Sequence, residues 1–373
     1  MTGVGADEVA TDWAKAAGRF SEIVSLHVTR QRRRPHYGRS TSPQSSVVEE
    51  AGFPAITARL PPALRPSRFM WPLNDRLALS PLMQAIEDAK HRFGAIDLIH
   101  THRYAGAAPI ARVAERQHIP LIHTEHSSAL IHENPYRRVS RAGLKQARIL
   151  YSRAAVVLFV SDQLREAATA HGLTGRFEVV PNPLDADQFH PRRRTPSQTI
   201  RLINVGSLIP VKRHELILEA LAMARAREPR LHLQILGTGP LESLLREQVI
   251  RLGLSDAVDL LGSVSRTQVA SHMADADIYV HSSGVETFGV AVVEALFCGL
   301  PVVATDSGGV VSNLTSPPCK LVSPNPEDMA GTILEIAGEL DLYNREEIAK
   351  GAREAFGLDA VARKLRRIYS DVL

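Results

Sequence analysis

The chain has 373 residues, which is long for a single hydrophobic core and suits two domains of α/β size. Hydrophobic residues make up 44% and charged residues 23%, a composition typical of folded globular proteins that excludes disordered and fibrous classes. The formal net charge of +4 is mild for this length, so no nucleic-acid partner is predicted.

The sequence shows no pattern of a signal peptide or a membrane helix. No stretch approaches the ~20 consecutive apolar residues of a membrane helix, and the first residues lack a basic-then-apolar signal pattern, which predicts a cytoplasmic protein. Arginines cluster at residues 31–36 and 190–196 beside proline, and we interpret both runs as solvated loops. The alternative is docking to an anionic membrane or nucleic acid, so membrane contact is expected to be peripheral at most.

Short β-branched runs alternate with segments of helical period along the chain, the pattern of a parallel sheet covered by helices. Strands are predicted at 22–28, 55–60, 96–100, 120–124, 156–160 and 177–180 in the first half. In the second half they are predicted at 201–205, 232–236, 258–261, 278–280 and 301–304, with helices such as 213–227 and 241–252 between them. The predicted fold class is therefore α/β, with two facing doubly wound Rossmann-like domains.

A polar, proline-containing segment at 184–199 shows neither period and is interpreted as the linker between the domains. The predicted organisation is an acceptor-side domain at 1–188, a donor domain at 198–357, and a C-terminal helix at 358–373 that crosses back to the first domain. Such sheets bind ligands beyond the carboxyl ends of their strands, so two facing sheets are expected to form a deep cleft for two substrates.

The beginning of the chain departs from the doubly wound pattern. Gly3 and Gly5 are followed at once by a helical segment from about Asp7 to Arg19, whereas a glycine-rich turn before the first helix normally follows a strand. We therefore expect a first strand encoded upstream of Met1. The alternative is that the sheet closes up or another segment fills the place.

Two carboxylates eight residues apart stand in the most informative segment, residues 281–309 (HSSGVETFGVAVVEALFCGLPVVATDSGG). Glu286 follows a predicted strand, and Thr287 is a candidate N-cap for the helix that carries Glu294. Gly289 lets the start of that helix approach a ligand closely. Free backbone N–H groups and the helix dipole make this terminus suited to a diphosphate. Glu294, about two turns into the helix, can accept hydrogen bonds from ribose hydroxyls.

A second segment, residues 203–220, places a lysine after a predicted strand that ends at Gly206. Lys212 opens the following predicted helix, where its ammonium group can meet a leaving diphosphate in a dry site. With such a cation no divalent metal is required, and the chain lacks a metal-binding Asp-x-Asp pair. A third segment, residues 119–130, places His126 just beyond the end of a strand that faces the expected cleft.

Together these segments resemble family 4 of the GT-B glycosyltransferases over about the last 280 residues. The family's E-x7-E signature is met by Glu286 and Glu294. The resemblance implies Glu286 near the donor sugar, Glu294 on the ribose, Lys212 on the diphosphate and His126 beside the reacting sugar. It also implies retention of anomeric configuration, a nucleoside-diphosphate-sugar donor as co-substrate and no resident cofactor or metal. Further donor-binding residues implied by position are Gly206, Ser207, Gly237, Val264, Thr287, Phe288, Gly289 and Val290.

One departure from the family pattern concerns phosphate binding, because Ser207 stands where arginine is common. Arg213 is next to Lys212, but a residue one step along a helix points about 100° away, so compensation is not predicted. The acceptor is left open between a glycan, a lipid-linked sugar and a small natural product. The alternatives are a nucleotide-sugar epimerase and a catalytically silent sugar-nucleotide-binding protein. An oxidoreductase is disfavoured because Glu242 stands where the third glycine of a G-x-G-x-x-G would be.

Overall fold

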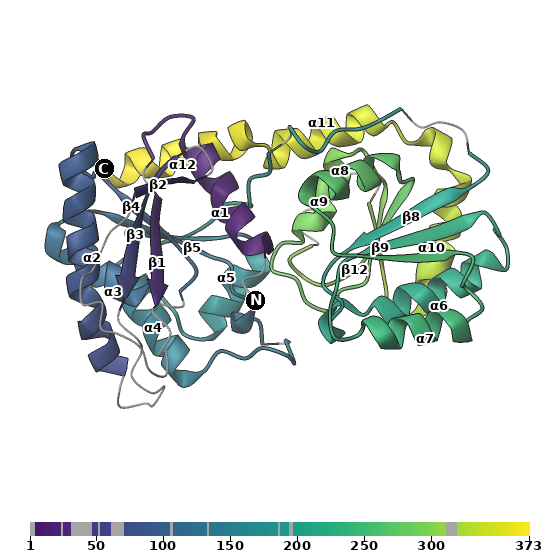
Figure 1. Cartoon of the computed structure of the whole chain (residues 1–373), viewed down its shortest axis with the longest axis horizontal. Helices are drawn as coiled ribbons and strands as arrows, with labels where there is room; N and C mark the ends of the chain where they lie inside the picture. The colour runs from purple at the N-terminus through teal and green to yellow at the C-terminus, as the bar shows by residue number, and fades with distance from the viewer. Residues whose placement is uncertain are drawn as a thin grey trace.

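The computed structural model describes residues 4–23, 25–30, 47–50, 53–60, 71–104, 107–132, 134–185, 187–193, 197–310 and 319–373. The described chain forms two α/β domains side by side (Figure 1). The first domain holds the strands up to residue 179, and the second holds those from residue 200 onward.

The described residues of the first domain form two sheets. Strands β1 (Ser25–Arg30), β3 (Phe53–Leu60) and β2 (Val47–Glu50) lie in that order, with β1 parallel and β2 antiparallel to β3. A separate parallel sheet has the order β4 (Ile99–His102), β5 (Leu121–Glu125), β6 (Val156–Phe159) and β7 (Phe177–Val179). Among the described residues β4 pairs only with β5, and β2 is a strand that the sequence analysis did not predict.

The helices of the first domain are α1 (Val4–Ala17), α2 (Trp71–Phe93), α3 (Ala108–Gln117), α4 (Arg141–Tyr151) and α5 (Asp162–Ala170). Local chemistry sets several of their ends. The Ser161 hydroxyl caps the start of α5, and His118 ends α3 in a left-handed conformation. Helix α1 already includes Gly5, so the expected glycine-rich turn before it is not formed there.

The second domain contains a six-stranded parallel sheet. Its spatial order is β10 (Val258–Gly262), β9 (Leu231–Leu236), β8 (Ile200–Val205), β11 (Ile278–His281), β12 (Val302–Thr305) and β13 (Cys319–Val322). Its helices are α6 (His214–Arg225), α7 (Glu242–Arg251), α8 (Arg266–Asp275), α9 (Val290–Phe297) and α10 (Pro326–Gly338). The five predicted strands are confirmed to within one residue, and β13 was not predicted.

The last two helices connect the domains. Helix α11 (Arg345–Phe356) lies along the second domain, and α12 (Leu358–Val372) lies over the first (Figure 1). On α12 the Tyr369 hydroxyl bonds His100 Nδ1 at 2.7 Å, and its ring packs edge-on against Phe20. Helix α12 therefore packs against strand β4 and against Phe20, which follows α1.

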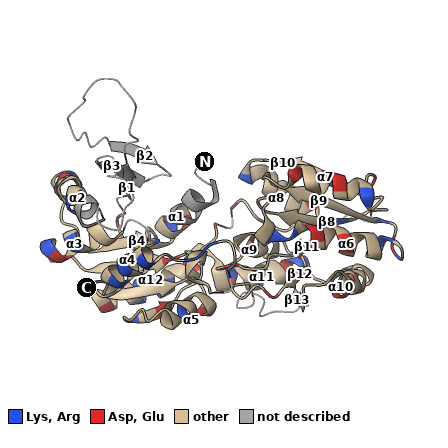
Figure 2. Ribbon diagram, turned by 90° about the horizontal axis from the view of Figure 1, so that it is seen from below, with Lys and Arg blue, Asp and Glu red and all other residues tan. Residues whose placement is uncertain are grey.

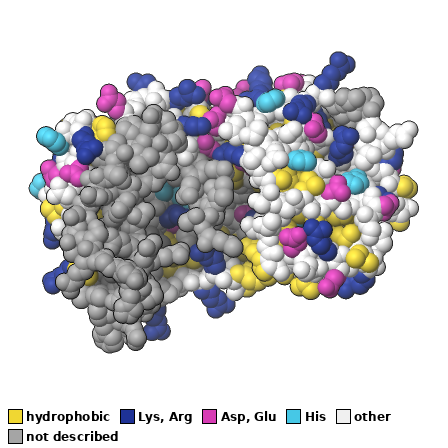
Figure 3. Space-filling model, in the orientation of Figure 1, with side chains coloured by type: hydrophobic (Ala, Val, Ile, Leu, Met, Phe, Trp, Pro, Cys, Tyr) yellow, Lys and Arg dark blue, Asp and Glu magenta, His cyan; other side chains and the backbone are white. Residues whose placement is uncertain are grey.

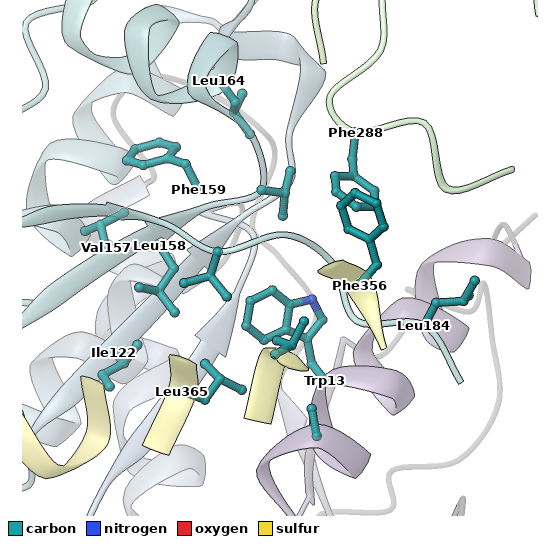
Figure 4. Packing of buried hydrophobic residues seen from close by; sticks show 14 of the residues in the cluster. Trp13, Ile122, Val157, Leu158, Phe159, Leu164, Leu184, Phe288, Phe356 and Leu365 are labelled. Atoms are coloured by element: carbon teal, nitrogen blue, oxygen red, sulfur yellow. The ribbon is translucent and has the colours of Figure 1, made fainter. Parts of the chain in front are cut away.

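A core of aromatic and branched residues holds α1 against the first domain. Trp13 points from α1 toward the strands and α12, and Phe288 of the second domain meets Phe356 in the same cluster (Figure 4). The Trp13 indole N–H is buried and donates to Asn182 Oδ1 at 2.9 Å, so the large ring is packed without leaving its donor unpaired.

Charged side chains of both signs are spread over the molecule. Lys and Arg occur on many elements of both domains with Asp and Glu among them, and the visible surface of the second domain is similarly mixed (Figures 2 and 3). Residues 31–36 and 194–196 of the two basic runs lie outside the described residues, and Arg192 pairs with Asp275 at 2.8 Å. None of the described helices has the length and apolar character needed to cross a membrane.

Candidate active site

The order of the second sheet reverses at the β8–β11 pair, because the chain continues from β8 to β9 on one side and from β11 to β12 on the other. A parallel sheet presents its ligand site beyond the strand ends at such a switch point. The loops that follow β8 and β11, residues 206–213 and 282–289, leave the sheet at this point. They carry the predicted Lys212 and Glu286.

Lys212 does not open a helix as predicted. It ends a short 3-10 turn, η2 (Pro210–Lys212), and Arg213 then takes a left-handed conformation with φ 50° before α6 begins at His214. Pro210 favours a turn start, and the reversal at Arg213 separates this turn from the helix. The backbone of Lys212 is held independently of its ammonium group, because the Ser282 hydroxyl donates to its carbonyl oxygen at 2.6 Å.

The Glu286 carboxylate is anchored through one oxygen. Lys212 Nζ and the Ser283 hydroxyl both donate to Oε1, the second at 2.9 Å, and His281 Nε2 lies 3.5 Å from the same atom. Among the described residues no donor reaches Oε2. The carboxylate is therefore fixed at one oxygen, with the other available to a ligand.

The charge state of this group follows from its neighbours. Burial opposes ionisation of Glu286, but the charge of Lys212 and the hydrogen bonds from Lys212 and Ser283 favour it, and the pKa of that carboxyl lies below its usual value. Burial lowers the pKa of His281 to about 4. At neutral pH the site thus contains an ionised carboxylate, an ammonium group and a neutral imidazole.

The start of α9 is formed by glycine and not by the predicted Thr287 cap. Gly289 is the N-cap residue at φ 79°, with no side-chain capping bond, and Val290 is the first residue of the helix. A Cβ at Gly289 would lie 2.6 Å from Val310 Cγ2, so conformation and space both require glycine. The Phe288 side chain is buried edge-on against Phe356, which leaves only its backbone for a ligand.

Glu294 lies on the first turns of α9 with 9% of its surface exposed. Its Oε1 is 3.5 Å from the Arg266 guanidinium at the start of α8. The predicted ribose carboxylate therefore already has a cation beside it, which the sequence analysis did not anticipate.

Two of the remaining candidate residues for binding the donor substrate, Gly206 and Gly237, are in close backbone contact. A Cβ at Gly237 would lie 1.9 Å from the carbonyl oxygen of Gly206, so the loops after β8 and β9 touch at a point where only glycine fits. Ser207 is exposed, and Val264 packs partly buried against the core.

Arg213 is placed differently from the sequence argument, which assumed a continuous helix. Its guanidinium packs against Gly284, where a Cβ would lie 2.7 Å from Arg213 Cζ. Because the left-handed conformation at Arg213 turns the side chain, the 100° helix rotation does not apply. Its cation thus lies on the loop that carries Glu286.

His126 lies in the first domain on a loop fixed by a buried glutamate. Glu125 Oε1 accepts the backbone N–H groups of His126 and Ser127, both at 2.9 Å. Glu125 Oε2 accepts from the Tyr151 hydroxyl at 3.0 Å and from the Tyr104 backbone N–H at 3.2 Å. In the sequence, the signal for this role is an acidic residue directly after the predicted strand 120–124.

A row of histidines surrounds His126. Its Nε2 shares a 3.1 Å hydrogen bond with His102 Nδ1, and the His102 ring stacks on His100. Burial and the neighbouring imidazoles lower the pKa of His126 well below its usual value, and the pKa of His102 falls to about 3. The pair is therefore neutral, with one proton between the facing nitrogens. Among the described residues no group of three or more His, Cys, Asp or Glu side chains could hold a metal ion.

The described residues bring Lys212 and Glu286 into direct contact and place Glu294 on the adjoining helix, whereas His126 lies on the other domain and contacts none of the three. The domains meet beside Glu286. The Gln163 amide of α5 lies over Gly308, whose neighbours Ser307 and Gly309 are hydrogen-bonded to the Glu286 backbone. Two surface cavities of about 450 and 480 Å³ lie elsewhere, one lined by α2 and α3 and one beside Arg192 and Arg345.

Family comparisons cover most of the chain. The model described as Glycosyltransferase Family 4 matches residues 27–188, and the model for glycosyl transferases group 1 matches residues 185–354. A D-inositol 3-phosphate glycosyltransferase of Geodermatophilus obscurus is 29% identical over 73% of this chain and 65% of its own length. The chain thus spans less than two thirds of the length of the first curated relatives that it matches.

Two solved structures show the same fold. Sucrose-phosphate synthase from Thermosynechococcus elongatus superposes with a TM-score of 0.72 at 20% identity, covering 99% of this chain and 93% of that one. Anabaena HepE in complex with UDP and glucose gives a TM-score of 0.68 at 20% identity, covering 86% and 87%. The chain belongs to glycosyltransferase family 4 and has the GT-B fold.

Proposed function

We propose that this protein transfers a hexose-type sugar from a nucleoside-diphosphate sugar to an acceptor hydroxyl, with retention of configuration and without a metal ion. The observation that carries this proposal is the Glu286 carboxylate, held through Oε1 by Lys212 and Ser283 at the start of α9. Departure of a nucleoside diphosphate builds negative charge on its oxygens. A fixed ammonium group beside the free N–H groups of a helix start stabilises that charge.

Each donor group then has a partner in the second domain. The diphosphate lies against Lys212 and the backbone of Phe288, Gly289 and Val290. The sugar hydroxyls donate to Glu286 Oε2, and the ribose hydroxyls to Glu294. UDP is the nucleotide to test first, because the structure of HepE contains UDP.

The first domain supplies the other side of the reaction. His126 is neutral and has its Nε2 toward His102, so its Nδ1 and backbone carbonyl are the atoms we assign to the reacting sugar. The Glu125 bonds fix this loop without charging the imidazole. Because the imidazole is neutral, it places no positive charge beside the anomeric carbon, where positive charge develops during transfer.

An inositol phosphate is the first acceptor to test, because the relative from Geodermatophilus obscurus is named for one. Arg103 supports an anionic acceptor. It is exposed, takes a left-handed conformation after β4, and its positive charge contributes to the low pKa of His126. We expect Arg103→Gln to raise KM for a phosphorylated acceptor more than for an unphosphorylated one.

A panel of nucleotide sugars, incubated with and without acceptors, tests the proposal. The expected result is acceptor-dependent release of nucleoside diphosphate that falls about 10²–10³-fold in a folded Glu286→Ala variant. Release that yields only an isomerised or hydrolysed sugar would favour a nucleotide-sugar epimerase. Binding without turnover would favour the silent binding protein, which the exposed Ser207 in place of a phosphate-binding arginine leaves as the second candidate.

A further inference from the structure

The Arg266 guanidinium lies between carboxylates of the two domains. It is 3.2 Å from Asp12 Oδ2 on α1 and 3.5 Å from Glu294 Oε1 on α9. The side chains of Arg266, Asp12 and Glu294 are 18%, 5% and 11% exposed. One cation is therefore shared by two carboxylates that approach from different elements.

This shared cation is shielded from water, which strengthens its interactions. The guanidinium packs over the ring of Phe189, 5.4 Å from its centroid, and Phe189 is itself buried. Burial raises the pKa of Asp12, and the charge of Arg266 is the largest influence that opposes this shift. Removing Arg266 takes the shared cation away from both carboxylates, whereas removing Asp12 leaves Arg266 to pair with Glu294 alone, so a change at one of the three side chains is expected to alter the pairing of the others.

Two neighbouring residues of helix α1, Asp12 and Trp13, contact the two proposed substrate sites. Trp13, next to Asp12, packs edge-on against His126 at a ring separation of 6.2 Å, and its indole N–H bonds Asn182. Asp12 meets Arg266 on the donor side. A shift of α1 relative to both domains would thus change the surroundings of His126 and of Glu294 together.

We propose that Arg266 is a positioning residue that couples nucleotide binding at Glu294 to the seating of α1 on the donor domain. This inference rests on the proposed ribose role of Glu294. Asp12 is the nearer partner of Arg266 and draws the guanidinium away from Glu294, so that the carboxylate can accept ribose hydroxyls. Because coupling between two sites is reciprocal, a bound nucleotide then favours the seated position of α1.

The first test needs no ligand and is a double-mutant cycle on thermal unfolding of the full chain. Arg266→Gln removes the cation that two buried carboxylates share and is expected to lower the unfolding midpoint by about 5 °C or more. Adding Asp12→Asn removes one of these charges and is expected to restore part of the loss. Losses that simply add in the double variant would overturn the shared-cation arrangement.

The second test is UDP affinity by titration calorimetry. Asp12→Asn is expected to weaken UDP binding about five- to tenfold, although Asp12 lies on the first domain, because Arg266 then pairs fully with Glu294. The matched control is Arg19→Gln, which breaks an exposed 3.2 Å ion pair with Asp359 and leaves Arg266 untouched. The control is expected to stay within about twofold of the wild type.

The outcomes separate this inference from the proposed function. If the wild type binds UDP and Asp12→Asn binds it as the control does, the coupling is wrong and the donor assignment stands. If the wild type binds no nucleotide of a donor panel, the proposed function fails, and the coupling fails with it.

Discussion

Replacing Lys212 with alanine removes the cation that anchors Glu286 and should disable transfer without unfolding the chain. The Lys212 carbonyl keeps its bond from Ser282, and Glu286 keeps Ser283, so the two loops retain their other contacts. The loss falls on the leaving diphosphate. We expect kcat/KM to drop about 10²–10³-fold, the usual cost of removing a fixed group that meets transition-state charge.

The effect on stability can be bounded from burial. Lys212 and Glu286 are 25% and 15% exposed, between the regime of surface pairs and that of fully buried pairs. We therefore expect a destabilisation of about 1–2 kcal/mol. A protein of ordinary stability, about 5–15 kcal/mol, stays folded after such a loss. A rate loss of about 10²-fold, which corresponds to roughly 2.7 kcal/mol in the activation barrier, is therefore not explained by unfolding.

The pH profile gives an independent readout. In the wild type the Glu286 carboxyl has a lowered pKa, so Glu286 stays ionised as the pH falls toward the usual carboxyl range. Without Lys212 the effect of burial dominates and raises that pKa, so the acid limb of activity moves to higher pH.

Nucleoside-diphosphate release, measured between pH 5 and 9, and thermal unfolding are the assays. Lys320→Ala is the matched control, because it breaks another Lys–Glu pair, with Glu335, away from the site. Near-normal turnover by folded Lys212→Ala, or an unchanged acid limb, would refute the role assigned to Lys212.

Further predictions follow from the same contacts. Ser283→Ala removes one neutral donor to Glu286 Oε1 and is expected to lower kcat/KM about tenfold, less than Lys212→Ala; an equal or larger loss would contradict this ranking. Gly289→Ala forces a side chain into a left-handed position 2.6 Å from Val310, so UDP binding should be lost and the unfolding midpoint lowered; unchanged calorimetry would show that the helix start is misassigned. Treatment with EDTA should leave turnover unchanged, and activity that is lost and then restored by magnesium or manganese would disprove metal independence. The product should keep the anomeric configuration of the donor, which NMR of the anomeric proton checks directly.

Most of the fold could be predicted from the sequence, because the burial of one or both faces of a helix or strand imposes a periodic pattern of apolar residues. Strands β8 and β11 are mostly apolar and buried in a sheet covered on both faces, and their bounds were predicted to within one residue. The short strands β2 and β13 were missed. Cys319–Val322 contains a lysine and is only partly buried, so it lacks the apolar run of a central strand.

The site was predictable where chemistry is local in sequence and not where it depends on tertiary contacts. Glu286, Gly289 and Glu294 lie within nine residues of each other, and Lys212 follows a recognisable strand. The bond from Lys212 to Glu286 spans 74 positions and the Arg266–Asp12 pair spans 254, so no local pattern indicates either. The Thr287 cap failed for a steric reason, because the chain enters α9 through a left-handed glycine that only Gly289 can supply.

A crystal structure of the full chain with UDP and a donor sugar tests the central claim most directly. The account predicts the diphosphate within hydrogen-bond distance of Lys212 Nζ and the backbone N–H groups at the start of α9, the ribose on Glu294 and the sugar on Glu286 Oε2. A nucleotide bound away from the ends of β8 and β11, or one whose diphosphate is held through a metal ion, would contradict it.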